Sequence, residues 1–243
     1  MRPLSAAQLL DAWERGLSEP AHRRVFPALA AAYSDSFDAL GALSIGERDR
    51  RLLMLRQWTF GSQLASVVNC SACGEGLEWT IDTADLLMSK PAELSGDLTV
   101  ESNDYCVGFR LPNTSDLSLV SECKDAASAR QALLERCVFG AEREGEAISA
   151  GALPDAVTTE IVKRMAEADP QADVEFDLSC PACGQRWQAQ FDIESFFWSE
   201  IGAWAQRILS EVHRLARAYG WSEMDILSLS PWRRQFYLSL LGT

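Results

Sequence analysis

Two Cys-x-x-Cys pairs contain the residues of this chain that are best suited to chemistry. Cys70 and Cys73 form the first pair, Cys180 and Cys183 form the second, and a glycine follows each pair directly. Two such pairs supply the four thiolates that close a tetrahedral structural zinc site. The glycine lets the chain turn back with a positive φ, so that backbone amides can point at the thiolates. The pattern therefore predicts one structural zinc ion bound by all four cysteines.

The two pairs are separated by residues 74–179, which is 106 residues. Compact zinc ribbons have roughly 15–20 residues between their pairs. Lengthening a closed loop from about 18 to about 106 residues costs roughly 1.6 kcal/mol, whereas a structural zinc ion contributes on the order of 10–16 kcal/mol. The long separation therefore does not exclude a shared site. Unlinked reduced pairs or disulfides are the alternatives, and redox chemistry is disfavoured because strand-like residues follow each pair where a redox motif would begin a helix.

Each pair needs two strands to position it. Apolar and polar residues alternate on both sides of each pair, which is typical of half-buried strands. The flanking segments are 65–69, 77–82, 174–179 and 187–192. We therefore expect two β-hairpins with the cysteines at their tips. Between them, residues 98–111 predict a further hairpin, and the Gly/Glu-rich segment 140–151 predicts a surface loop.

Helical periodicity dominates both ends of the chain. Ser44, followed three residues later by Glu47, predicts the start of a helix that runs to about Phe60. Residues 193–219 repeat apolar side chains at helical spacing and end at Gly220. The sequence therefore predicts an α+β fold that is mostly helical, with short β-hairpins forming a four-Cys zinc-ribbon-like site. The predicted segments are an N-terminal helical region (1–62), a zinc-ribbon-like module (63–83 plus 173–192), a mixed α/β insert (84–172) and a C-terminal helical region (193–243).

Composition narrows the class of partner and the compartment. The net charge of −13 and the pI near 4.6 argue against nucleic-acid binding, which needs clustered Lys and Arg. Seven cysteines is an odd number, and Cys106, Cys123 and Cys137 lie in apolar surroundings that predict small core residues. This cysteine usage favours a reducing cytoplasm. We expect no signal peptide and no membrane insertion, because no stretch of about 18 uncharged apolar residues occurs.

The sequence contains no recognisable set of acid–base or nucleophilic residues. In the sequence, the two histidines, His22 and His213, do not form an enzyme-like pattern with cysteine, serine or acidic residues, and no Gly-rich phosphate loop is present. Arg110 and Asp116 predict a buried ion pair or a turn clamp with a structural use. We therefore expect no enzymatic activity and no small-molecule substrate, and other proteins as partners.

Aromatic and arginine side chains are concentrated near the end of the sequence. The candidate partner-binding residues are Trp221, Trp232, Arg233, Arg234 and Tyr237. Aromatic side chains with arginine are typical of protein-interface hot spots. The alternative is that the aromatic residues fill a C-terminal core and that the arginines pair with acidic residues of this chain, such as Glu223 and Asp225.

Several stretches together indicate a family. They are Cys70–Gly74, Phe109–Pro112 with Asp116–Leu117, Leu133–Cys137, Asp169–Asp173, Cys180–Gly184, Val212–Glu223 and Ile226–Leu238. The sequence resembles the baseplate proteins of contractile-tailed phages and phage-like contractile injection systems, and is similar to the T-even phage baseplate hub assembly proteins. The resemblance implies a non-catalytic role in forming a baseplate, with other baseplate, hub or tail proteins as partners. It leaves open whether the protein stays in the finished particle or is a zinc-dependent assembly chaperone or adaptor that is absent from it.

Overall fold

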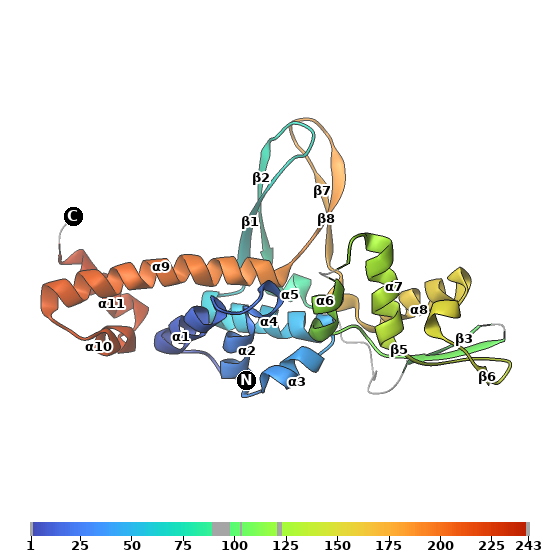
Figure 1. Ribbon diagram of the computed structural model, residues 1–243. Helices are drawn as coiled ribbons and strands as arrows, with labels where there is room; N and C mark the ends of the chain where they lie inside the picture. Colours follow the sequence, from blue (N-terminus) through green and yellow to red (C-terminus); the bar gives the residue numbers. More distant parts are fainter. Residues whose placement is uncertain (1, 89–97, 103, 121–122, 242–243) are drawn as a thin grey trace. The chain divides into compact units, whose positions relative to one another are not determined.

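The chain forms two compact units. The computed structural model describes residues 2–88, 98–102, 104–120 and 123–241 (Figure 1). One unit, here called the terminal unit, consists of Met1–Phe37 and Ile193–Thr243, and the other, the central unit, consists of Asp38–Asp192. The two ends of the sequence therefore fold together, and the central unit is inserted between them.

The terminal unit is helical in its described residues. Its elements are α1 (Ala6–Gly16), the 3-10 helix η1 (Ala21–Arg23), α2 (Phe26–Tyr33), α9 (Ile193–Tyr219), α10 (Glu223–Ser228) and α11 (Pro231–Ser239). Ser5 begins α1 in a capping box with Gln8. The 27-residue helix α9 has the predicted bounds, and Gly220 ends it with a φ of 67°.

One apolar stripe of α9 forms the core of the terminal unit. The buried α9 residues recur at spacings of three and four, which places them on one helix face. They are Ile193, Phe197, Ile201, Ala205, Ile208, Val212 and Leu215. Leu10 of α1, Ile226 and Leu227 of α10 and Leu238 of α11 pack against the C-terminal half of this stripe. The last two helices are therefore held by apolar contacts with α9.

The central unit combines helices with antiparallel strands. Its elements are α3 (Phe37–Ala42, whose first residue is counted with the terminal unit), α4 (Ile45–Phe60), β1 (Gln63–Asn69), β2 (Gly76–Asp82), α5 (Thr83–Leu86), β3 (Leu98–Ser102), β4 (Tyr105–Phe109), α6 (Thr114–Val120), α7 (Ala126–Cys137), β5 (Val138–Arg143), β6 (Glu146–Ala147), the 3-10 helix η2 (Ala150–Ala152), α8 (Asp155–Ala168), the 3-10 helix η3 (Pro170–Ala172), β7 (Glu175–Ser179) and β8 (Arg186–Gln190). The Ser44 side chain accepts the Glu47 N–H at the start of α4, as predicted.

A four-stranded sheet, ordered β3-β4-β5-β6, contains strands that the sequence did not predict. Residues 140–151 were expected to be a loop, and this prediction is wrong for β5 and β6. Gly140 pairs with Gly108, and Ala141 pairs with Val107, so that Ala141 is buried while its neighbours are exposed. With one small residue on the core side, β5 has too weak an apolar alternation to be recognised from sequence.

The sheet and helices α7 and α8 share one core. Val107 and Phe109 of β4 pack with Leu134 of α7 and Ile161 of α8. Cys137 is fully buried beside this region, as predicted, whereas Cys123 is half-buried. The prediction that Cys106 is a core residue is wrong, because Cys106 precedes the buried Val107 and therefore points to the opposite, exposed face of β4.

A buried carboxylate joins α6, α7 and the residue that follows β4 in the central unit. Asp116 of α6 accepts two hydrogen bonds from Arg110, at 2.7 and 2.9 Å, and one from Arg136 of α7, at 3.2 Å. Asp116 has no exposed side-chain surface. Burial by itself would raise the pKa of this carboxyl, but the hydrogen bonds from Arg110 and from the Asn113 backbone N–H hold it below its ordinary value. Asp116 therefore forms the predicted ion pair with Arg110 and also closes the turn at Asn113; its carboxylate is buried, whereas Arg110 is 37% exposed.

The observed architecture is α+β and mostly helical with short antiparallel hairpins, which confirms the predicted fold class. The two compact units are defined by contacts in space, whereas the four predicted segments are defined by patterns in the sequence. The two divisions cannot be compared directly, so the four-segment division stays a prediction. Among the described residues, none of the helices has the length and apolar character that a membrane crossing requires.

Candidate metal centre

The two Cys-x-x-Cys pairs adopt the same turn at the tips of two hairpins. In the first turn the Cys70 N–H donates to the Glu75 carbonyl at 2.8 Å, and the Gly74 N–H donates to the Cys70 carbonyl at 2.9 Å. In the second turn Cys180, Gly184 and Gln185 make the equivalent bonds at 2.8 and 2.9 Å. The φ angles of the two glycines are 77° and 74°. Both turns therefore have the positive-φ glycine that the sequence predicted.

The four thiols lie together in space. The Cys70 and Cys183 Sγ atoms are 3.7 Å apart, the Cys73 and Cys180 Sγ atoms are 3.6 Å apart, and all four lie within 4.8 Å of one another. A tetrahedron with four metal–sulfur bonds of about 2.3 Å has edges of about 3.8 Å. All four cysteines are free thiols. The cluster therefore has the ligand type, number and spacing of a four-thiolate metal site.

Backbone amides point at the sulfur atoms, as the tight turns require. The Cys73 and Ala72 N–H groups donate to the Cys70 thiol and lower its pKa to about 7. The Glu75 N–H lowers the pKa of Cys73, but the hydrogen-bonded thiols of Cys183 and Cys180 outweigh it and raise that pKa to about 12. Four thiols this close cannot all ionise without a counter-charge, because neighbouring thiolates repel one another. A divalent cation supplies that counter-charge, so the cluster fits a metal ion.

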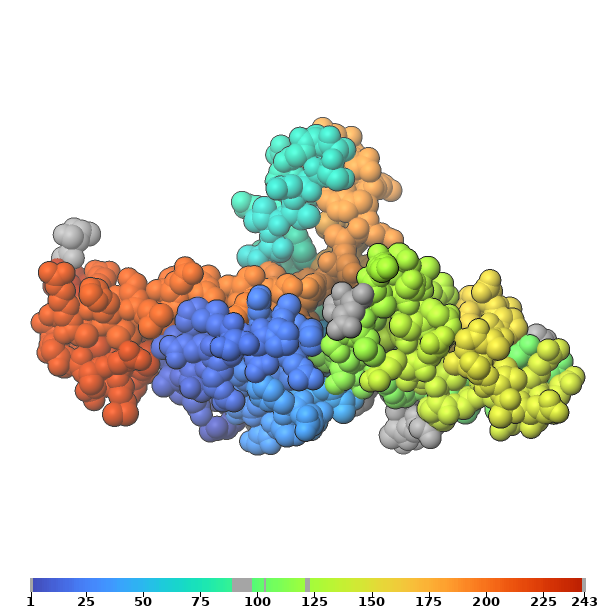
Figure 2. Space-filling model, viewed as in Figure 1, coloured from blue at the N-terminus to red at the C-terminus, as the bar shows by residue number. Residues whose placement is uncertain are grey.

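Three sets of contacts bring the two hairpins together. We call β1, β2, β7, β8 and their two Cys turns the arm; its hairpins lie side by side and meet at their tips (Figures 1 and 2). Below the thiols, the rings of Trp79 and Phe176 meet edge to face, with centroids 4.5 Å apart. At the base, the Gln171 side chain accepts from the Met88 N–H and donates to the Leu86 carbonyl, at 2.9 and 3.2 Å. The first hairpin is thereby tied to the segment that leads into the second.

The first hairpin is also fixed to the end of α4. Arg56, which is 3% exposed, donates to the carbonyls of Gly61 and Gln63 at 2.6 and 2.8 Å. The Ser62 hydroxyl donates to the Asp82 carboxylate at 2.7 Å across the base of the hairpin. The Ala84 N–H donates to the same carboxylate, which lowers the pKa of Asp82. These contacts set the direction in which the strands leave the helix.

The predicted partner-binding residues divide into two environments, and their binding role stays a prediction. Trp232 and Arg233 are exposed, and Trp221 and Tyr237 are half-buried with ring centroids 5.0 Å apart. Arg234 is 4% exposed and pairs with Glu211 at 3.2 Å, and not with either of the two acidic residues named from the sequence. The two adjacent arginines therefore have different surroundings, and only the first faces solvent.

Burial raises the pKa of carboxyls that the sequence did not indicate, among them Asp49 and Asp169. Asp49 is half-buried in α4, 2.8 Å from the Arg48 guanidinium. Burial raises the pKa of Asp49 to about 6, and the nearby carboxyls of Asp192 and Asp169 add to this effect. Periodicity could not identify it, because a charged residue on a helix is ordinarily exposed.

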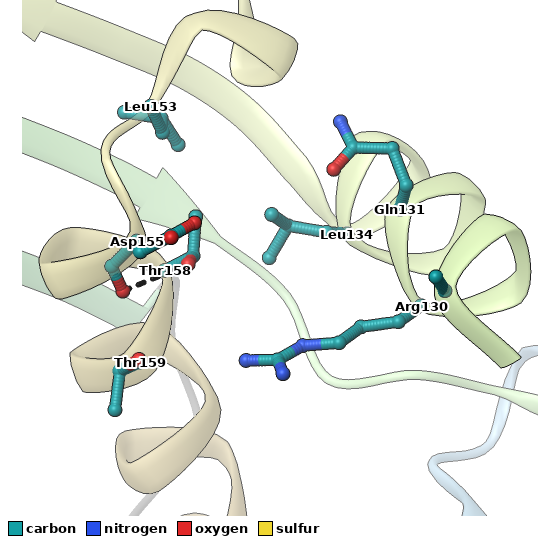
Figure 3. Close-up of a pocket in the computed structure, with 8 residues that line it drawn as sticks. Arg130, Gln131, Leu134, Leu153, Asp155, Thr158 and Thr159 are labelled. Carbon is teal, nitrogen blue, oxygen red and sulfur yellow. Dashed lines mark hydrogen bonds between the residues drawn. The ribbon is translucent and has the colours of Figure 1, made fainter.

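A surface pocket of 380 Å³ separates α7 from α8. Figure 3 shows the Arg130 side chain reaching into this space toward Thr159, with Leu134 next to it on α7 and Leu153 at the other end of the pocket. The drawn hydrogen bond joins the Thr158 hydroxyl to the Asp155 carbonyl at 3.0 Å, which is a contact within one helical turn. The pocket contains no nucleophile with an adjacent base, so we assign no chemistry to it.

The α+β fold and the arm together describe a protein with a four-thiol cluster that could hold a metal ion. Residues 28–198 match the family described as T4 bacteriophage base plate protein. This range covers 171 of the 243 residues and includes all four clustered cysteines. The chain therefore belongs to this phage baseplate protein family. Comparison with curated proteins and with solved structures gave no match.

Proposed function

We propose that this protein is a non-catalytic, zinc-binding component of the baseplate of a contractile phage tail or a contractile injection system, and that it acts in baseplate assembly or structure. The observation that carries the proposal is the convergence of four thiols, from hairpins 106 residues apart, in a chain of a baseplate family. Other baseplate, hub or tail proteins are its proposed partners.

Zinc is the proposed ion because of the donor set. Soft thiolates select zinc or iron–sulfur chemistry, and four thiolates around one tetrahedral ion leave no position open for a substrate. Such a site supports structure. In this chain it would hold the tips of the two hairpins together, since Cys70 and Cys73 belong to one hairpin and Cys180 and Cys183 to the other. Elemental analysis of freshly purified protein tests this, with one zinc per chain expected; iron in its place, or no metal, contradicts it.

A non-catalytic role is supported by the ion pairs of two carboxyls whose pKa values are shifted. Asp116 is engaged by two arginines, and Asp49 lies against Arg48. A general acid or base needs a reachable proton-transfer partner, and these carboxyls face ion-pair partners. A reproducible turnover that one polar substitution abolishes, without unfolding the protein, contradicts the proposal.

The second candidate is a zinc-dependent assembly chaperone or adaptor that is absent from the finished particle. The family membership does not distinguish the two roles, because either role would involve other baseplate proteins. Quantitative mass spectrometry of purified particles separates them. A fixed copy number per baseplate supports a structural component, whereas presence in assembly intermediates and absence from mature particles supports the chaperone.

A further inference from the structure

Helix α11 exposes large apolar side chains in addition to the one that packs in the core of the terminal unit. Its inner face packs on α9 and α10 through Leu238, and Arg234 is buried on the same side. Its outer face carries Trp232, Phe236 and, just past the helix end, Leu240. These three side chains are 73%, 49% and 61% exposed. Residues four apart lie on one helix face, so the three form a continuous apolar ridge, here called the α11 ridge.

The ridge is held in a defined conformation. The Trp232 and Phe236 rings stack at a centroid distance of 5.7 Å and an interplanar angle of 13°. On the inner face, Arg234 donates to Glu211 at 3.2 Å and to the Leu229 carbonyl at 2.6 Å. Gln235 donates to the second oxygen of Glu211 at 2.6 Å. A surface that is ordered before binding loses little conformational entropy on binding.

The charge beside the ridge is positive although the chain is acidic. Helix α11 contains no acidic residue, and Arg233, next to Trp232, is exposed. Residues 204–241 contain five arginines and three acidic residues, which gives +2, against −13 for the whole chain. Glu211 already accepts hydrogen bonds from Arg234 and Gln235. Arg207 and Gln235 both line a pocket of 180 Å³, which Glu211 and Arg234 also line. A complementary surface would therefore be apolar with a carboxylate border.

We propose that the α11 ridge inserts into an apolar groove, bordered by carboxylates, between helices of another baseplate protein. Side chains at i, i+4 and i+8 are the anchors that a helix presents to such a groove, and a four-residue ridge is the commonest unit of helix–helix packing. This inference rests on the proposed baseplate function. The ridge lies beyond residues 28–198, so it is not a consequence of the family match.

Site-specific photo-crosslinking identifies the occupant. The photoreactive residue benzoylphenylalanine replaces Phe236 in the full-length protein, expressed in cells that assemble the particle. The matched control replaces Phe139, a phenylalanine of β5 in the central unit that is 58% exposed. We expect position 236, and not position 139, to crosslink to one baseplate protein, at an apolar helical segment flanked by Asp or Glu.

Binding measurements with that identified protein then test the anchors. Trp232→Ala and Phe236→Ala should each weaken binding by about 30-fold, the scale of a hot-spot residue. Arg233→Glu should also weaken binding, and a Lys substitution of the bordering carboxylate on the partner should restore it. Phe139→Ala should leave the affinity unchanged. The melting temperatures should stay near that of the wild type, because the substituted side chains are exposed.

Other outcomes overturn the inference. A crosslink from position 236 only to a second copy of this chain would assign the ridge to self-association. No adduct at position 236, or ridge variants that bind and assemble like the wild type, would show that the ridge is not a docking surface. If the protein still binds zinc and enters baseplate intermediates in that case, the proposed function stands and only this inference fails.

Discussion

Metal removal is expected to loosen the arm and to leave the four-stranded sheet folded. Among the described residues of the four arm strands, Leu64 is the only fully buried one. Every other strand residue is exposed or half-buried. Isolated two-stranded hairpins are at best marginally stable in water. The sheet, in contrast, has a core of its own with Val107, Phe109 and Ile161 fully buried.

The free energies of the contacts in the arm favour local opening of the arm over unfolding of the whole central unit. A structural zinc site contributes on the order of 10–16 kcal/mol in small zinc-folded peptides. The Trp79–Phe176 ring pair, which joins the two hairpins with centroids 4.5 Å apart, contributes about 0.5–1.5 kcal/mol beyond its buried area. Because each 1.4 kcal/mol is a factor of ten, even a loss of about 3 kcal/mol at the tip, well below the zinc contribution given above, would raise the open population of the arm by about 100-fold.

Hydrogen–deuterium exchange, with and without a strong chelator, measures this effect. Exchange of the β1, β2, β7 and β8 amides should accelerate by about 100-fold or more. Exchange of the β4 and β5 amides should change by no more than about threefold. Cys73→Ser should reproduce the effect of the chelator, because it removes one of the four ligands. Cys106→Ser is the matched control, since Cys106 is an exposed cysteine outside the arm.

Two results would refute this reasoning. Unchanged protection of the arm, with metal loss verified by elemental analysis, would show that side-chain packing alone holds the hairpins. Simultaneous loss of protection in the arm and in β4 would show that the metal supports the whole central unit. Acidification should act like the chelator, because thiolates must be deprotonated to bind the metal.

Three further predictions concern single substitutions, the last of which has a matched control. Asp116→Ala should lower the free energy of unfolding by about 2–4 kcal/mol in urea denaturation, because it removes the buried partner of Arg110. Since the pKa of Asp116 is lowered in the fold, this loss of stability should be complete at neutral pH and should shrink only under acid conditions. An effect below about 0.5 kcal/mol at pH 7 would contradict a structural role. The pKa of Asp49 is raised to about 6, so its proton binds more tightly in the fold, and the free energy of unfolding falls as the pH rises from about 4 to 6. Asp49→Asn should reduce this dependence of the free energy of unfolding on pH. An unchanged dependence would disprove the raised pKa of Asp49. Gly74→Ala should cost about 1–2 kcal/mol through its positive φ and should weaken metal binding in a competition assay, whereas Gly145→Ala, with a φ of 84° and equally open space, should cause similar strain and leave the metal affinity unchanged.

The sequence alone determined the features of this protein that depend on residues close together along the chain. The Cys-x-x-Cys-Gly turns were predictable because their geometry depends on five consecutive residues and on the conformational freedom of one glycine. The bounds of α9 were predictable because its apolar spacing extends over seven turns and ends at Gly220. In both cases the information lies within the segment itself.

Only the tertiary structure decided which segments meet and which faces stay exposed. The two Cys turns come together through Trp79, Phe176 and Gln171, whose contacts span roughly 80 to 100 residues and leave no local pattern. Strand β5 forms because β4 offers it backbone partners, although its own residues hardly alternate. Likewise, the sequence of α11 supports two apolar faces, and only its packing on α9 determines that Leu238 is buried and that Trp232 faces solvent. A residue's neighbours along the chain define its local conformation, but its burial depends on residues that folding brings from elsewhere.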